Sequence, residues 1–311
     1  MLSVVVLVSL PLYVLNIRMF LRMKPEKGVV VYLLSLSIID ALYTAFLLLT
    51  ITYRFSENNW IFGEVSCRVV TVIFYFRFGC SAIHLTCITW TCRGAALPPI
   101  AVYPPVNRMR KAFSTCYLIW FFSLLTTLPV VFSHQTQEIL ELGIMTCHDV
   151  QPSDESNLLF VYFYANVVSV WFIIPFGAIC WSCIELVRHF TAARTKIVGR
   201  KRRTLVLAFI MLCVFALCYG PTNIIIIYHF VGHLMWRNPS LNFAYILCAS
   251  TSSLTCCLSP LISYYASRQY RKCVRKLARR IIKRAQTLTS WTSRSTPEVE
   301  QGDQPEDVTA M

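Results

Sequence analysis

The hydrophobic residues of this chain gather into seven long stretches, which are separated by short polar segments. Each stretch reaches or exceeds the roughly 20 apolar residues that a helix needs to cross a hydrocarbon layer about 30 Å thick. The stretches lack the alternation typical of barrel strands, and only helices and closed barrels satisfy their backbone hydrogen bonds in lipid. The pattern therefore predicts an all-α, integral membrane bundle of seven helices. The predicted spans cover about residues 1–22, 28–53, 65–96, 112–133, 158–187, 204–232 and 241–266.

Basic residues are concentrated in the polar segments on one side of the predicted bundle. The basic clusters lie at residues 18–27, 108–111, 188–203 and 268–284. The acidic residues of the opposite segments are Glu57, Glu64, Glu138, Glu141, Asp149, Asp154 and Glu155. The positive-inside rule then places the basic segments in the cytoplasm and the amino terminus outside the cell. This topology accounts for the formal net charge of +14, so we expect no nucleic-acid partner.

The predicted spans use most of the 311 residues, which leaves no room for a separate catalytic domain. We predict one membrane domain over residues 1–283 and a cytoplasmic tail over residues 284–311. The tail is polar, becomes acidic toward its end, and is predicted to be disordered. Its hydroxyl residues are candidate phosphate acceptors, namely Thr287, Thr289, Ser290, Thr292, Ser293, Ser295 and Thr296.

A strongly basic segment directly follows the seventh span. Apolar residues recur in it at helical spacing, namely Tyr270, Cys273, Val274, Leu277 and Ile281. We expect a short amphipathic helix that lies in the headgroup plane, where its basic residues attract anionic membrane lipids. Cys273 lies on the apolar stripe, and palmitoylation and an unmodified thiol are equally open there.

Most of the 14 cysteines lie within the predicted spans, where a thiol packs as a small apolar group. Cys67 at the outer end of the third span and Cys147 in the longest outer loop instead face an oxidising compartment, which favours a disulfide between them. We expect this bridge to hold the outer loop over the mouth of the bundle. No residue spacing suits a metal, a phosphate loop or a nucleophile with its base, so we expect neither a cofactor nor an enzyme.

Asp40 lies in the middle of the second span, where an unpaired carboxylate costs at least ~3 kcal/mol. Arg77 is the other charge deep within a span, and Ser81 lies one turn further along the same helix face. Asn16 and Ser259 are candidate partners from other spans. A structural ion pair with Arg77 and an ion-binding or switch role are two open interpretations of Asp40. A sodium ion beside Asp40 is expected only if Arg77 does not pair with it.

Proline interrupts five of the spans. The residues are Pro11, Pro129, Pro175, Pro221 and Pro260. Proline frees a backbone carbonyl and kinks the helix, which permits a hinge. Broken helices also occur in transporters, so the prolines alone do not separate a receptor from a transporter.

These features together resemble the rhodopsin-like G protein-coupled receptors, from residue 1 to about residue 283. The resemblance rests on Asn16, on Asp40 in LSLSIID, on Trp60-x-Phe62-Gly63 leading to Cys67, on Trp120, on Pro175, on Phe215-x-x-Cys218-x-x-Pro221, and on Pro260. It implies a plasma-membrane receptor that relays binding at its outer side to a heterotrimeric G protein. A phosphorylated tail would in addition bind arrestin.

Within this class the chain is most similar to the protease-activated, thrombin-type receptors. The similarity lies in TCHDV of the outer loop, CYGPTNIIIIYHF of the sixth span and FAYILCASTSSLTCCLSPLISYYAS of the seventh. It implies a peptide or tethered ligand freed by a protease, as in blood coagulation. Nucleotide receptors are also similar, but the basic residues of their sixth span would fall near Asn223 and Ile226, which counts against a phosphate ligand.

Four residues are our candidates for ligand contact, although ordinary packing at the membrane boundary explains them equally well. They are His148, Asp149, Tyr228 and His229. An acidic outer rim would attract a basic ligand. The candidate switch is the sixth span swinging on its proline, together with the proline of the seventh span. The switch residues are Phe215, Cys218, Tyr219, Pro221 and Pro260.

Two departures from the family pattern concern coupling. The Asp-Arg-Tyr triplet aligns with Thr91, Cys92 and Arg93, so a cysteine replaces the arginine that engages the G protein. The switch tyrosine after Pro260 is replaced by Ser263. These changes leave a non-signalling decoy receptor as the alternative function. A transporter or channel ranks last, because only two charges lie deep in the spans.

Overall fold

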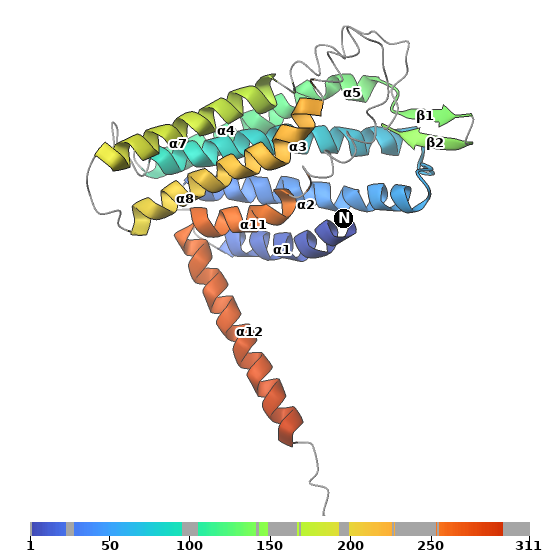
Figure 1. The fold of residues 1–311 in the computed structure, drawn as a ribbon. Coiled ribbons are helices and arrows are strands. Elements are labelled where there is room, and N and C mark those ends of the chain that lie inside the picture. Colours follow the sequence, from blue (N-terminus) through green and yellow to red (C-terminus); the bar gives the residue numbers. More distant parts are fainter. Residues whose placement is uncertain are drawn as a thin grey trace, which may run out of the picture. The chain divides into compact units, whose positions relative to one another are not determined.

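The computed structural model describes residues 2–22, 28–94, 105–140, 143–148, 167, 169–192, 199–225, 227, 253 and 255–294. The chain divides into two units, Met1–Tyr270 and Arg271–Met311. The first unit contains the helical bundle. Three long helices, α1 (Leu2–Arg22), α2 (Gly28–Phe55) and α3 (Gly63–Gly94), run side by side within it (Figure 1).

The remaining helices of the bundle are shorter or interrupted. They are α4 (Pro105–Thr126), α5 (Leu128–Phe132), η1 (Ser169–Ile173), α7 (Ile174–Ala192), α8 (Gly199–Val214), η2 (Phe215–Tyr219) and α11 (Thr255–Ala266). Among the described residues, five helical segments are long and apolar enough to cross a membrane. They are Leu2–Arg22, Gly28–Phe55, Gly63–Gly94, Val170–Thr191 and Arg202–Ile225. The helical class that the apolar pattern predicts is thus the observed one.

The fourth predicted span, residues 112–133, is not one helix. It is divided at Thr127, between the end of α4 and the start of α5. Pro129 has no N–H to donate and its ring clashes with the carbonyl four residues earlier, so a continuous helix is strained there. The Thr127 backbone N–H and hydroxyl both donate instead to the Leu124 carbonyl, at 3.0 and 2.8 Å.

A small antiparallel hairpin in the outer loop was not expected from the sequence. Strand β1 (Thr136–Ile139) pairs with β2 (Ile144–Cys147), from Thr136 opposite Cys147 to Ile139 opposite Ile144. Gly143 in the connection has a φ of 63°, which glycine adopts without strain. The hairpin lies at the end of the bundle where α2 ends and α3 begins (Figure 1).

The helix after the seventh span is longer than predicted. Helix α12 (Arg268–Arg294) continues for 11 residues into the region for which disorder was expected, residues 284–311. That expectation is wrong for residues 284–294. Arg, Lys, Ala, Gln and Leu favour helix, and the first helix-breaking residue is Pro297. Residues 295–311 lie outside the described part of the chain.

The bundle is apolar outside and partly polar inside. Leu7, Tyr117 and Leu217 are 70–75% exposed, as expected for side chains that face lipid. Asp40 and Arg77 are both 1% exposed. Such an arrangement suits a hydrocarbon surrounding, since polar groups inside it need partners that lipid does not offer.

Candidate functional site

The centre of the bundle holds an ion pair between α2 and α3. Arg77 Nε donates to Asp40 Oδ1 at 3.0 Å, and each side chain is 1% exposed. Both charges lie far from the ends of their helices, so water does not replace either partner. The pairing considered from the sequence is therefore present, and each charge neutralises the other.

Helix α11 completes the hydrogen bonding of both charges. Ser259 Oγ donates to Asp40 Oδ2 at 2.6 Å. Arg77 Nη2 donates to Thr255 Oγ1 and contacts Cys256 Sγ at 3.3 Å. The Arg77 guanidinium also lies 4.9 Å from the centroid of the Tyr43 ring. Because both carboxylate oxygens have donors and the charge is balanced, the condition under which we expected a sodium ion is not met.

A second contact between helices follows from Pro260. This proline has no N–H for the carbonyl of Cys256, the residue four positions earlier in α11. Tyr13 of α1 supplies the missing hydrogen bond. Its hydroxyl donates to the Cys256 carbonyl at 2.6 Å. The part of the seventh span around Pro260 is thereby tied to α1. The sequence analysis missed Tyr13, although a proline within a span always leaves a carbonyl to be satisfied.

Two residues predicted for this network do not join it. Ser81 Oγ is buried and has no hydrogen-bond partner in the described part of the protein. Asn16 Oδ1 instead accepts from the hydroxyl of Tyr270, whose ring stacks on Phe20 at 5.3 Å. Asn16 thus ties α1 to the first residues after the seventh span.

The outer loop is fastened to α3 by the predicted disulfide. Cys67 and Cys147 are bridged, with their Cα atoms 5.7 Å apart and a separation of 80 positions in sequence. Trp60 packs in the same buried cluster as the two cysteines and Tyr53. Its backbone N–H donates to the Met145 carbonyl at 2.7 Å, which also holds β2 against the segment between α2 and α3.

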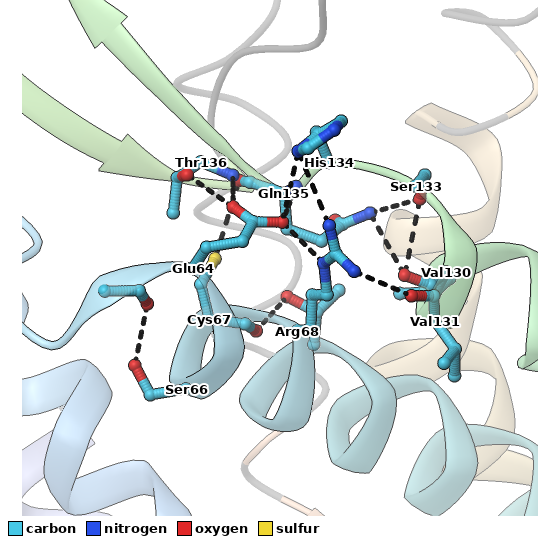
Figure 2. Close-up of polar contacts among 12 residues, drawn as sticks. Glu64, Ser66, Cys67, Arg68, Val130, Val131, Ser133, His134, Gln135 and Thr136 are labelled. Carbon is cyan, nitrogen blue, oxygen red and sulfur yellow. Dashed lines mark hydrogen bonds and ion pairs between the residues drawn. The ribbon is translucent and has the colours of Figure 1, made fainter.

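Glu64 is a second anchor of the outer loop that the sequence analysis did not single out. Its Oε1 accepts from Arg68 Nε at 2.6 Å and from the Gln135 backbone N–H at 3.0 Å. Its Oε2 accepts from the Thr136 backbone N–H at 2.9 Å and from the Thr136 hydroxyl. Figure 2 shows the carboxylate pointing from α3 toward the start of β1. A Glu in the first turn of a helix, four residues before an Arg, is the signal that could have identified this role.

One predicted ligand residue, His148, lies against α3 and contacts Gln135 of the same loop. Its Nε2 is 2.9 Å from the Tyr75 hydroxyl and its Nδ1 is 2.8 Å from Gln135 Oε1. The residue has a φ of 59°, an uncommon conformation for a side chain other than glycine. The other three predicted ligand residues, Asp149, Tyr228 and His229, lie outside the described residues.

Two of the candidate switch residues meet in a stack of aromatic rings. Phe215 and Tyr219 are 4.9 Å apart between ring centroids, and Tyr219 is 4.8 Å from Phe78 of α3. Both residues belong to η2, a wide helical turn directly before Pro221. Such a turn relieves the clash that a proline makes with the preceding turn. Cys218 is buried in the same turn.

At the end of α3 far from Cys67, Cys92 and Arg93 align with the family triplet that engages the G protein, and the two residues differ in their contacts. Arg93 pairs with Glu185 of α7, and its guanidinium lies 4.6 Å from the centroid of the Trp90 ring. Cys92 is half-buried. The arginine is therefore held between the third and fifth spans.

The chain is similar to known receptors over most of its length. A family model described as 7 transmembrane receptor (rhodopsin family) matches residues 6–263. Proteinase-activated receptor 1 of Xenopus laevis is 38% identical over 89% of this chain and 66% of its own length. The human protein of the same name is 34% identical over 87% of this chain and 64% of its own length.

A relative with another name is similar to a slightly lower degree. A purinoceptor of Gallus gallus is 32% identical over 80% of this chain and 70% of its own length. The chain spans between 62% and 66% of the length of the proteinase-activated receptors that it matches.

Proposed function

Because the chain belongs to the rhodopsin family of seven-transmembrane receptors, we propose that it relays binding of an extracellular peptide to a heterotrimeric G protein. The similarity to proteinase-activated receptor 1 supports a peptide or tethered ligand that a protease frees. The observation that carries the proposal is the outer loop, which is fixed to α3 by a disulfide and by the Glu64 carboxylate. A loop held in this way provides a preformed surface for a ligand.

The proposed ligand surface consists of His148, Asp149, Tyr228 and His229. His148 contacts both Tyr75 of α3 and Gln135 of the loop, so a ligand that touches it would act on the third span. The acidic residues of the loop favour a peptide with a basic end. We propose that the amino terminus and this loop face the cell exterior, as the distribution of basic residues indicates.

The proposed moving part is the sixth span. Phe215 and Tyr219 stack on each other in the turn before Pro221, so an outward swing of α8 would repack the rings against Phe78. Pro260 provides a second candidate hinge, in the seventh span. Next to it, the Tyr13 hydroxyl links this span to α1 through the Cys256 carbonyl. The buried Asp40–Arg77 pair would keep the second, third and seventh spans in register during the motion.

The proposed inner surface is formed by Cys92 and Arg93. Arg93 is paired with Glu185, so binding of a G protein at this point would compete with an existing ion pair. We also propose that the tail binds arrestin when phosphorylated, and that Cys273 is a lipidation site next to anionic membrane lipids. No cofactor is needed for any of these steps.

The test is nucleotide exchange on G proteins in membranes from cells that express the full-length protein. Addition of trypsin, which cuts after basic residues, is expected to raise GTP exchange above that of cells without the receptor. The variant Cys147→Ser is the control, because it keeps the spans but releases the outer loop. Wild-type receptor that is present at the surface, is cut by trypsin and yields no exchange would overturn the signalling function.

A non-signalling decoy is the second candidate, and it has a specific observation in its favour. Cys92 stands at the position of the family's coupling arginine. The neighbouring Arg93 forms an ion pair with Glu185. The decoy predicts no exchange in the wild-type receptor and measurable exchange after Cys92→Arg. Exchange in the wild-type receptor excludes it.

A further inference from the structure

A groove on the outside of the bundle has no ligand assigned to it above, and one of its lining residues, Cys218, is also a candidate switch residue. It has a volume of about 470 Å³ and is lined by side chains from Leu205 to Cys218, with Leu258 contributed by α11. Among the described residues, its lining contains no charged or hydroxyl side chain. The groove therefore offers nothing to a water-soluble ligand, and its chemistry matches that of a hydrocarbon chain.

The groove has the length of one lipid chain. Thirteen helical steps separate Leu205 from Cys218, which corresponds to about 20 Å at 1.5 Å per residue. One leaflet of the hydrocarbon core is about 15 Å thick. The groove is thus long enough for an acyl chain that starts beside Leu205 to cross its whole leaflet, and the far end of the groove lies at the wide turn η2. Phe209 along this path is 61% exposed, so the groove is open to the lipid phase.

Exposed positive charge lies beside the Leu205 end of the groove. Arg202 and Arg203 are both exposed and come one helical turn before Leu205 and Val206. Residues three or four apart share a helix face, so Arg202 continues the row of lining residues beyond the end of the groove. Arginine binds phosphate through paired N–H groups, and basic residues at a membrane surface attract anionic lipid.

From this combination we infer that the groove binds one anionic phospholipid of the leaflet that contacts the basic ends of the spans. The phosphate lies at Arg202 and Arg203, and one acyl chain occupies the groove as far as Cys218. The site joins α8 and η2 to Leu258 of α11, so a bound chain holds the sixth span against the seventh. The proposal does not depend on the nature of the ligand or on coupling to a G protein.

The test uses the purified full-length protein in phosphatidylcholine nanodiscs with one of two photoreactive lipids. Phosphatidylserine and phosphatidylcholine carry the same diazirine acyl chain, and mass spectrometry locates the label. We expect phosphatidylserine to label residues 205–218 more strongly, by about fivefold for each arginine that contributes ~1 kcal/mol. The ratio of phosphatidylserine labelling to phosphatidylcholine labelling at the exposed residue Leu124 of α4 is expected to stay near unity.

Two sets of variants separate the headgroup from the chain. Replacing both arginines, as Arg202→Gln with Arg203→Gln, is expected to remove the preference for phosphatidylserine but not the labelling itself. Cys213→Trp is expected to fill the groove and reduce labelling by both lipids, and Val206→Trp serves the same purpose at the other end if the first variant does not fold. Arg22→Gln and Leu124→Trp are the matched controls on other helices.

Three outcomes would overturn the inference. Equal labelling by the two lipids would mean ordinary contact with the surrounding membrane. Labelling that Cys213→Trp and Val206→Trp both leave unchanged would place the lipid outside the groove. Loss of the labelling on addition of cholesterol, with no effect of the arginine substitutions, would identify a sterol as the occupant instead.

Discussion

The Asp40–Arg77 and Glu64–Arg68 pairs join the same kinds of side chain in opposite surroundings. The side chains of the first pair are each 1% exposed, whereas those of Arg68 and Glu64 are 31% and 26% exposed. Asp40 is bonded to side chains of α3 and α11, so its removal affects the packing of three helices. Glu64 is bonded mainly to the loop around β1. The inner pair thus holds the bundle together, and the outer pair positions the loop.

The largest effect is expected from Arg77→Met, which leaves the Asp40 carboxylate buried without a counter-charge. Breaking a buried pair in this way costs about 3–5 kcal/mol. Thermal unfolding of the purified protein in detergent measures the loss. In the double variant Arg77→Met with Asp40→Asn most of the stability should return, because no buried charge is left. A single variant as stable as the wild type would contradict the role assigned to the pair.

The next effect is expected from Cys147→Ser, which frees the outer loop from α3. A closure of this length is worth up to about 4.5 kcal/mol in the chain-entropy model, and less when the helices stay in the membrane. Hydrogen exchange of residues 136–147 should rise, while that of α2 stays unchanged. Cys257→Ser serves as the control, since it removes a half-buried free thiol elsewhere. Unchanged exchange in the hairpin would show that Glu64 and Trp60 hold the loop without the bridge.

A smaller effect is expected from Tyr13→Phe, which removes the donor to the Cys256 carbonyl. A buried acceptor left without a partner costs about 1–3 kcal/mol. Adding Pro260→Ala restores a helical N–H for the same carbonyl, so the double variant should recover part of the loss. Thermal unfolding of the four proteins in this cycle gives the coupling between the two positions. Additive losses would mean that the tyrosine and the proline act independently.

The smallest effect is expected from Arg68→Met, the same substitution at the exposed pair. Ion pairs of this exposure contribute about 0–1 kcal/mol. The two backbone N–H groups of the loop still bond to Glu64, so the hairpin should keep its protection from exchange. A loss as large as that of Arg77→Met would show that exposure does not separate the two pairs.

Parts of the site could be predicted because the chemistry of their residues leaves few possible partners. A charge in the middle of an apolar span needs a partner, and only Arg77 was available at that depth. Two cysteines that are predicted to face an oxidising compartment have few alternative partners, and Cys67 and Cys147 are bridged. The Glu64 anchor was missed, since its partners Gln135 and Thr136 are ordinary loop residues about 70 positions away. The contact of Tyr13 with Cys256 joins residues 243 positions apart, and no pattern within one span indicates it.

The sequence by itself determined the class of protein, because seven apolar stretches of membrane length leave only a helical bundle in lipid. It also determined where helices are weak, since proline breaks the backbone hydrogen bonding wherever it stands. Only the tertiary structure decided that α1 supplies the donor for the carbonyl freed by Pro260, and which loop groups donate to the Glu64 carboxylate. Hydrogen bonds act over about 3 Å, so their partners depend on how the helices pack and not on their order along the chain.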